Sequence, residues 1–138
     1  MTRAMQFLHE EASDREALRR RVRQMYGWFN REFWEKCFSL IDPKLREKSK
    51  VDLSDYVERS RVFKEAYGAI NLWHIRISLH LDASSNKHDE RPFAYVYVIW
   101  QDNARGFHMF RERWVKHAGG WFTRVIGLVP NKQESVTS

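Results

Sequence analysis

The sequence is poor in cysteine, which forms covalent cross-links, and in proline and glycine, which interrupt helices and strands. Among its 138 residues are one cysteine, Cys37, three prolines and six glycines. A single cysteine excludes an internal disulfide framework and a zinc site made of cysteines alone. The longest unbroken apolar run, residues 93–100, is far shorter than the roughly 20 residues of a membrane-spanning helix. We therefore expect no membrane partner and a reducing, cytoplasmic location.

Motifs for phosphate, metal or nucleotide binding are also missing. No G-x-G-x-x-G or Walker pattern occurs, and Gly119 and Gly120 are typical of a hairpin turn. His74 and His80 share one face of a predicted strand, but six residues of strand put them about 20 Å apart, too far to bind one metal ion. We expect no metal and no cofactor. Cys37 is flanked by apolar residues on a helix, a setting that raises a thiol pKa and makes it inert.

What the sequence does have is typical of a globular domain. Apolar residues make up 43%, charged residues 30% and aromatic residues 14% of the chain. This composition is too rich in aromatic residues for a disordered chain. No linker divides the sequence, so we predict a single domain over 1–138. Its ordered core should span about 14–129, with flexible ends at 1–12 and 131–138.

The first half has the periodicity of helices. A helix capped by Ser13 or Asp14 carries an apolar stripe with helical spacing, formed by Leu18, Val22, Met25, Tyr26, Phe29 and Phe33. A second helical segment spans 32–41 and ends at Asp42-Pro43, because a residue before proline avoids helical angles. A third should run from Asp52 or Ser54 to Tyr67, where Gly68 is a plausible stop.

The second half alternates as strands do. Residues 69–82 place Trp73, Ile75 and Ile77 on one face and His74 and Arg76 on the other. Further strands are predicted over 93–101, 107–117 and 121–129, with a tight hairpin at 118–120, so that neighbours are antiparallel. The predicted fold class is α+β, with three N-terminal helices packed on a curved antiparallel sheet of about four strands.

Three stretches of the sequence carry a resemblance to a known fold: residues 30–43, the helix at 54–67, and the hairpin at 112–121. Together with the element order, they resemble the nuclear transport factor 2-like superfamily, an α+β cone of the cystatin-like class. The resemblance implies a cone-shaped hydrophobic pocket between sheet and helices and frequent dimerisation through the sheet. Members include isomerases, dehydratases, polyketide cyclases and non-catalytic domains, so the fold alone does not choose a function.

Six aromatic residues are expected to line this pocket: Tyr26, Phe29, Tyr56, Phe63, Phe110 and Trp114. Catalysis of the isomerase type needs a carboxylate base inside the cone. Glu112 is the only carboxylate in the middle of a predicted strand. It lies inward in an apolar setting that raises its pKa, outward in solvent, or inward beside an arginine. Tyr26 or Tyr56 would be the hydrogen-bond donor to a ligand, or simply a core aromatic residue.

The strand at 93–101 is apolar on both faces, and only one face can cover the helices. A second subunit is the simplest cover for the other. We therefore predict a homodimer with Tyr97 or Trp100 in its interface, and a solvent or dimer surface that includes His74 and Arg76.

The net charge of +6 and a pI of about 9.7 invite comparison with nucleic-acid-binding proteins. The excess is spread along the chain, with one local peak at residues 19–23, Arg-Arg-Arg-Val-Arg, which is typical of a solvated helix face. We find no base-stacking signature of the RNA-recognition type.

Three functional hypotheses follow. The leading one is a non-catalytic, dimeric domain that binds a hydrophobic small molecule or a partner peptide in its cone. The alternative is a pocket enzyme with Glu112 as general base and Tyr26 or Tyr56 as donor. The second alternative is nucleic-acid binding through the basic first helix.

Overall fold

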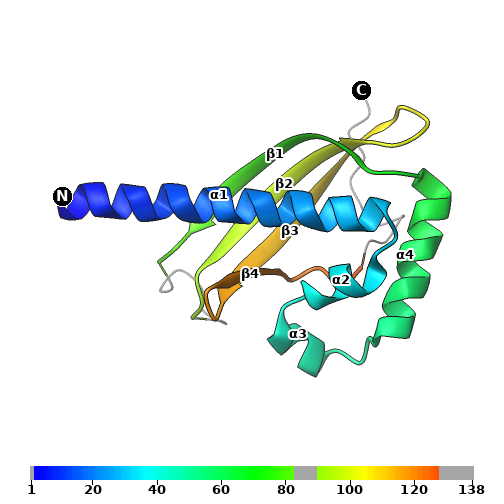
Figure 1. The fold of residues 1–138 in the computed structure, drawn as a ribbon, viewed down its shortest axis with the longest axis horizontal. Coiled ribbons are helices and arrows are strands. Elements are labelled where there is room, and N and C mark those ends of the chain that lie inside the picture. The colour runs from blue at the N-terminus through cyan, green and yellow to red at the C-terminus, as the bar shows by residue number, and fades with distance from the viewer. Residues whose placement is uncertain (1, 83–89, 128–138) are drawn as a thin grey trace.

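The computed structural model describes residues 2–82 and 90–127 and confirms the α+β class. Within these residues, four helices precede a four-stranded antiparallel sheet with strand order β1-β2-β3-β4 (Figure 1). The helices are α1 (Arg3–Asn30), α2 (Trp34–Ser39), α3 (Pro43–Lys48) and α4 (Leu53–Tyr67). The strands are β1 (Asn71–His80), β2 (Phe93–Gln101), β3 (Phe107–His117) and β4 (Gly120–Thr123).

The long helix α1 begins earlier than its sequence predicts. Thr2 caps it, since its hydroxyl accepts a hydrogen bond from the Met5 N–H at 3.2 Å. Residues 3–12, which we expected to be flexible, are therefore helical. At the other end, the Asn30 side chain accepts from the Ile70 N–H and donates to the Ile70 carbonyl, at 2.8 and 2.9 Å. This pair of hydrogen bonds fixes the end of α1 beside the start of β1.

The sequence missed the short helix α3. We took Asp42-Pro43 as the end of a helix, whereas α2 already ends at Ser39 and Pro43 is the first residue of the next helix. Proline fits that position because the first helical N–H has no partner within the helix. The helix α4 agrees with the prediction of a helix from Asp52 or Ser54 to Tyr67. Asp52 caps it, and Gly68 ends it, as predicted, with a φ of 77° that other residues rarely adopt.

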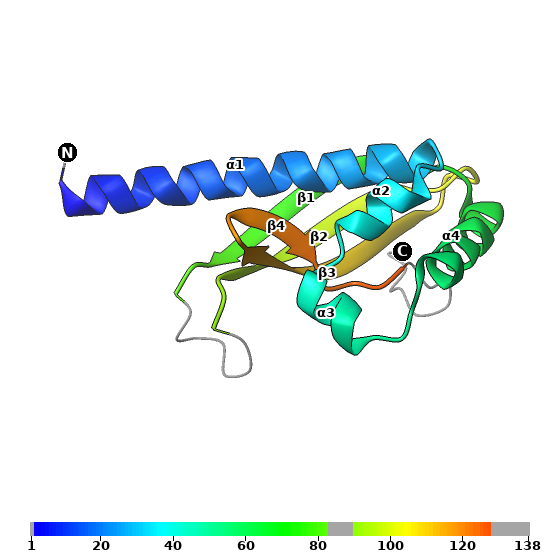
Figure 2. The same ribbon diagram turned by 60° about the horizontal axis from the view of Figure 1, so that its bottom comes forward.

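One face of the sheet, which we call the inner face, packs against α1 and α4 (Figures 1 and 2). On β2, the inward positions are Ala94, Val96, Val98 and Trp100, all buried. Trp100 is 1% exposed and packs on Phe63 of α4, with ring centroids 5.7 Å apart. The prediction that Trp100 lies in a dimer interface is therefore wrong, because the alternation along β2 sends it into the core.

A bulge in β1 overturns a second detail. The register between β1 and β2 shifts between Leu72 and His74, so Trp73 has no partner in the ladder. We placed Trp73 on the same face as Ile75, but Ile75 is buried and Trp73 is 64% exposed. The extra residue of a bulge turns a side chain to the opposite face. The last strand also differs: β4 ends at Thr123, whereas we predicted a strand over 121–129, of which 128 and 129 lie outside the described residues.

The core is organised around Phe63. Its ring is fully buried and contacts four other aromatic rings with centroids 4.8 to 6.0 Å away, those of Phe29, Tyr67, Trp100 and Phe110. It thus joins α1, α4, β2 and β3 in one cluster. Such pairs add to the free energy that burial of the rings contributes.

Replacing Phe63 by alanine should lower the free energy of unfolding by about 3–5 kcal/mol, because the cavity left among four rings cannot collapse fully. Urea denaturation followed by circular dichroism measures the change. Phe33→Ala is the matched control, since Phe33 is 42% exposed, and it should cost about 1 kcal/mol or less. Equal losses in the two variants would contradict this description of the core.

Candidate functional site

Glu112 of β3 lies on the inner face of the sheet, in the space between the sheet and the helices that we call the cone. It is 2% exposed and accepts a hydrogen bond from the Tyr26 hydroxyl at 2.5 Å and another from the Trp114 indole N–H at 3.1 Å. Of the three arrangements left open by the sequence, this is the inward one in apolar surroundings. The partners of the carboxylate are a tyrosine and a tryptophan, and no arginine pairs with it among the described residues.

Burial dominates the electrostatics of this pair. It raises the pKa of Glu112, against the two hydrogen bonds, which favour the charged form. The pKa of the Tyr26 hydroxyl is raised well above its ordinary value by burial first and by the nearby Glu112 second. Tyr26 therefore stays protonated and donates, and both oxygens of Glu112 are occupied by donors of the chain itself.

The cavity beside this pair is small. Its volume is about 20 Å³, close to the 10–15 Å³ needed for one water molecule. It is lined by residues of α1, α4, β3, β4 and the segment after β4, namely Met25, Tyr26, Phe29, Tyr56, Glu112, Thr123, Val125 and Gly127. The described residues thus leave room in the cone for about one water.

The six predicted pocket residues all lie in the interior, but only three of them line this cavity: Tyr26, Phe29 and Tyr56. Phe63, Phe110 and Trp114 fill the remaining space as core. Tyr56 lies next to Cys37, and burial raises the pKa of both groups, that of Cys37 to about 12. A thiol with that pKa stays protonated at neutral pH and is a poor nucleophile.

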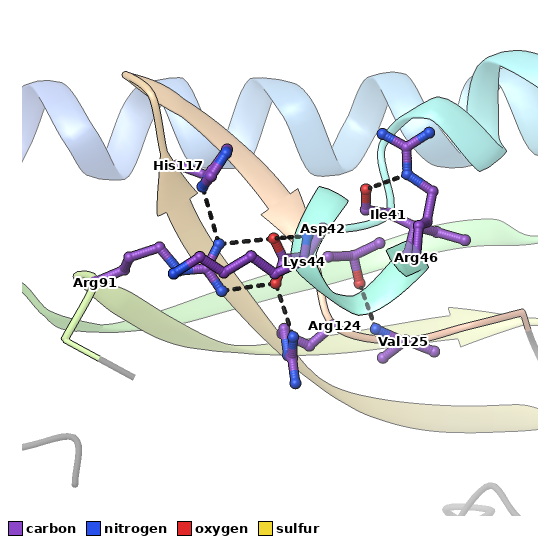
Figure 3. Close-up of polar contacts among 9 residues, drawn as sticks. Ile41, Asp42, Lys44, Arg46, Arg91, His117, Arg124 and Val125 are labelled. Carbon is purple, nitrogen blue, oxygen red and sulfur yellow. Dashed lines mark hydrogen bonds and ion pairs between the residues drawn. The ribbon is translucent and has the colours of Figure 1, made fainter. Parts of the chain in front are cut away.

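A second buried polar cluster, around Asp42, escaped the sequence analysis (Figure 3). Asp42 is fully buried between α2 and α3 and binds the Arg91 guanidinium with both oxygens at 2.7 Å. Arg124 donates to Asp42 Oδ2 at 2.7 Å, and the Lys44 N–H donates to Oδ1. His117 Nδ1 lies 3.1 Å from Arg91 Nη1.

The cluster joins segments that are far apart in the sequence. The Asp42 N–H also donates to the Thr123 carbonyl, and the Thr123 N–H to the Leu40 carbonyl, so the chain after α2 lies along β4. Burial alone would raise the pKa of Asp42, but the hydrogen bonds and charges of Arg91 and Arg124 lower it to about 2. The carboxylate is therefore charged at all physiological pH values and links the segment between α2 and α3 to Arg91 and Arg124.

The other face of the sheet carries a different set of side chains, and none of the described helices covers it (Figures 1 and 2). We call it the open face and define it by the outward residues of the three long strands. They are Trp73, His74, Arg76, Ser78 and His80 of β1, Phe93, Tyr95, Tyr97, Ile99 and Gln101 of β2, and Phe107, Met109, Arg111, Arg113 and Val115 of β3. Tyr97, His74 and Arg76, which we predicted for a dimer interface, lie here.

Arginines cover the rings of the open face. The guanidinium of Arg76 lies 5.2 Å from the ring centroid of Tyr97, that of Arg111 lies 4.6 Å from Tyr95, and that of Arg113 lies 4.5 Å from Phe93. These are cation–π contacts between neighbouring strands. At the bulge, Trp73 meets the edge of Phe107, with centroids 5.0 Å apart.

No residue of the open face is acidic, and its charged side chains are Arg76, Arg111 and Arg113. None of the three forms an ion pair within the described residues. Our sequence analysis found no base-stacking pattern because the rings are spread over three strands. The alternation of inward and outward residues along each strand was the signal that could have placed these rings on one face.

Other candidate chemistry is structural. His108 and Asp102 pair at 2.6 Å, and Asp102 also accepts from the Gly106 N–H, which closes the turn between β2 and β3. The described residues hold no group of three or more side chains suited to a metal ion. No helix among them is long and apolar enough to cross a bilayer.

Comparisons with known proteins give no match. No protein-family model, no curated protein and no solved structure is significantly similar to this chain. The function is therefore argued from the geometry of the molecule.

Asp42→Asn should lower the free energy of unfolding by about 3 kcal/mol at pH 7, because Arg91 and Arg124 lose the charge that they enclose. The pKa of Asp42 is depressed in the folded state, so its contribution is complete above about pH 4 and is lost as the pH falls towards 2. By linkage, this loss is about 2 kcal/mol in the wild type and is missing in the variant. Urea denaturation at several pH values measures both effects.

Asp55→Asn is the control, because Asp55 is exposed in the first turn of α4. It should change stability by about 0.5 kcal/mol and leave the acid dependence in place. If Asp42→Asn behaved like Asp55→Asn, the cluster would not hold the fold together.

Proposed function

We propose that this chain is a non-catalytic binding domain that contacts its partner through the open face of the sheet, with a cone interior filled by its own side chains. The observation that carries the proposal is the contrast between the two faces. The inner face encloses a cavity of about 20 Å³, whereas ligand pockets for small molecules usually measure about 300 Å³ or more. The open face carries three arginines, the exposed Trp73 and partly exposed aromatic residues such as Tyr97, and aromatic residues and arginine are enriched in interfaces.

The interior polar groups also support this proposal. A general base must reach a substrate proton through a free oxygen. Both oxygens of Glu112 are hydrogen-bonded by Tyr26 and Trp114, and the adjacent space holds about one water molecule. The pair is therefore best explained as a satisfied buried network that positions α1 on β3.

One observation favours the enzyme alternative. Glu112 combines burial, a raised pKa and a place beside the cavity, which is the combination expected of a general base. In this alternative, Tyr26 turns away from Glu112 when a substrate enters, and the cavity widens. A catalytic domain of this kind would lose turnover in the Glu112→Gln variant.

The remaining expectations stay predictions. The resemblance to the nuclear transport factor 2-like superfamily is one of them, and the order of helices before a four-stranded antiparallel sheet is the order that it implies. A homodimer through Tyr97, His74 and Arg76 is one form that binding through the open face can take. The cytoplasmic location also remains a prediction.

Native mass spectrometry of the freshly purified protein tests the proposal, with two variants that separate the faces. Tyr97→Glu adds a charge to the centre of the open face, and Glu112→Gln changes the cone. We expect no small-molecule adduct on the wild type. Any bound macromolecule, including a second copy of the chain, should be lost from Tyr97→Glu and retained by Glu112→Gln, because only the first variant alters the contact surface.

Circular dichroism of both variants checks that they are folded. An adduct on the wild type that disappears in Glu112→Gln would show that the cone is the binding site. That result would replace our proposal by the pocket-enzyme or small-ligand alternative.

A further inference from the structure

We propose that the open face binds single-stranded nucleic acid, with aromatic rings that stack on bases and arginines that contact phosphates. This inference rests on the proposed function, since it names the partner of the same surface. It differs from nucleic-acid binding through the basic first helix, which uses the opposite side of the molecule.

The charged side chains of the open face are all arginines. Arg76 of β1 and Arg111 and Arg113 of β3 lie on the two strands that flank β2. No acidic residue of the open face opposes them, and they form no ion pair within the described residues. Arg76 and Arg111 flank Tyr97 directly in the strand register. A surface with positive charge alone attracts an anionic partner.

The same charge argues against a second copy as the occupant. A two-fold dimer brings the same patch of both subunits together. Here each copy would present Arg76, Arg111 and Arg113 to the same three arginines, with no carboxylate on this face to separate them. Like charges placed opposite one another in an interface are unfavourable.

The open face also carries several aromatic side chains that are at least partly exposed. Trp73 is 64% exposed, and Tyr95, Tyr97 and Phe107 are partly exposed. Bases of a single strand stack on exposed rings such as that of Trp73 whatever their sequence. They also stack on arginine guanidinium planes, here those of Arg76 and Arg111 over Tyr97 and Tyr95. In a duplex the base faces are already stacked on one another, so this surface fits a single strand.

Two arginine side chains of the open face are already ordered in the unbound protein. The guanidinium of Arg111 lies over Tyr95 and that of Arg76 over Tyr97 before any ligand arrives. A guanidinium stacked on a ring keeps its N–H donors in its own plane, where they can reach phosphate oxygens. Because the side chains are already ordered, binding loses less conformational entropy.

The size of the face also suits a short segment of strand. β2 has nine residues, which corresponds to about 30 Å of extended chain. OB-fold domains, which bind single strands on a β surface, cover roughly 4–16 nucleotides each. We expect a site in the lower part of that range.

Fluorescence anisotropy of the full chain with fluorescein-labelled oligo(dT) and oligo(U) of about 20 nucleotides tests this inference. We expect binding by both, weaker binding of a duplex of equal length, and a logarithmic salt dependence with a slope of about −2 for three arginine–phosphate contacts. Inorganic polyphosphate serves as an anion without bases and should compete less well than unlabelled oligonucleotide.

Two double variants separate stacking from charge. Tyr95→Leu with Tyr97→Leu should weaken binding by about tenfold or more, because two stacking platforms are lost. Arg76→Ala with Arg111→Ala should weaken it by a similar factor at low salt and reduce the slope to about −0.7. The matched control is Arg20→Ala with Arg23→Ala, which removes two exposed arginines from α1 and should leave affinity unchanged within about twofold.

The outcomes separate this inference from the proposed function. Loss of binding in the α1 variant but not in the open-face variants would overturn the inference, as would full binding by the tyrosine variant or no binding by the wild type. Light scattering on the same samples reports the oligomeric state. A dimer that Tyr97→Glu dissociates, together with no oligonucleotide binding, would overturn the nucleic-acid inference while binding through the open face still stood.

Discussion

The helices that cover the four-stranded sheet, α1 and α4, pack on one of its two faces, and the other features of the fold follow from this arrangement. Along β2 and β3 each successive side chain points to the opposite face, so alternate residues form the core and the uncovered outer surface. The inward positions, such as Val98 and Phe110, form the core with α1 and α4. The outward positions, such as Tyr97 and Arg111, are left without a cover from the described helices. The apolar content of the outward positions therefore requires either a partner or local cover, and stacked arginines supply part of the latter.

Polar groups buried in this fold serve its geometry. Glu112 fixes α1 against β3 through Tyr26, and Asp42 fixes the segment between α2 and α3 against β4 through two arginines. In both places every oxygen of the carboxylate has a donor, which is the condition for a buried charge to be tolerated. The cost of burying these groups is offset by bonds between segments that are distant in sequence. A carboxylate so fully bonded has little freedom left for chemistry, and this directs attention to the surface of the molecule.

Local patterns in the sequence predicted the α+β class, the helix that starts near Asp52 or Ser54 and stops at Gly68, and the antiparallel order of the strands. They failed where a single residue changes the geometry or where contacts are remote. One bulge moves Trp73 to the open face, and proline starts α3 instead of ending a helix. The Asp42 cluster joins positions 42, 91 and 124, which no local pattern connects. The orientation of Trp100 followed from strand alternation, but we assigned it to the interface because both faces of β2 are apolar.

From the contrast between the two faces of the sheet, we infer that this molecule binds its partner on the open face and not inside the cone. Nuclear magnetic resonance of the ¹⁵N-labelled chain tests it directly, because indole and guanidinium N–H signals report on both places at once. On titration with an oligo(dT) of about 20 nucleotides, we expect shifts for the Trp73 indole and for Arg111, and none for the Trp114 indole beside Glu112. Shifts at Trp114 with Trp73 and Arg111 unmoved would contradict it.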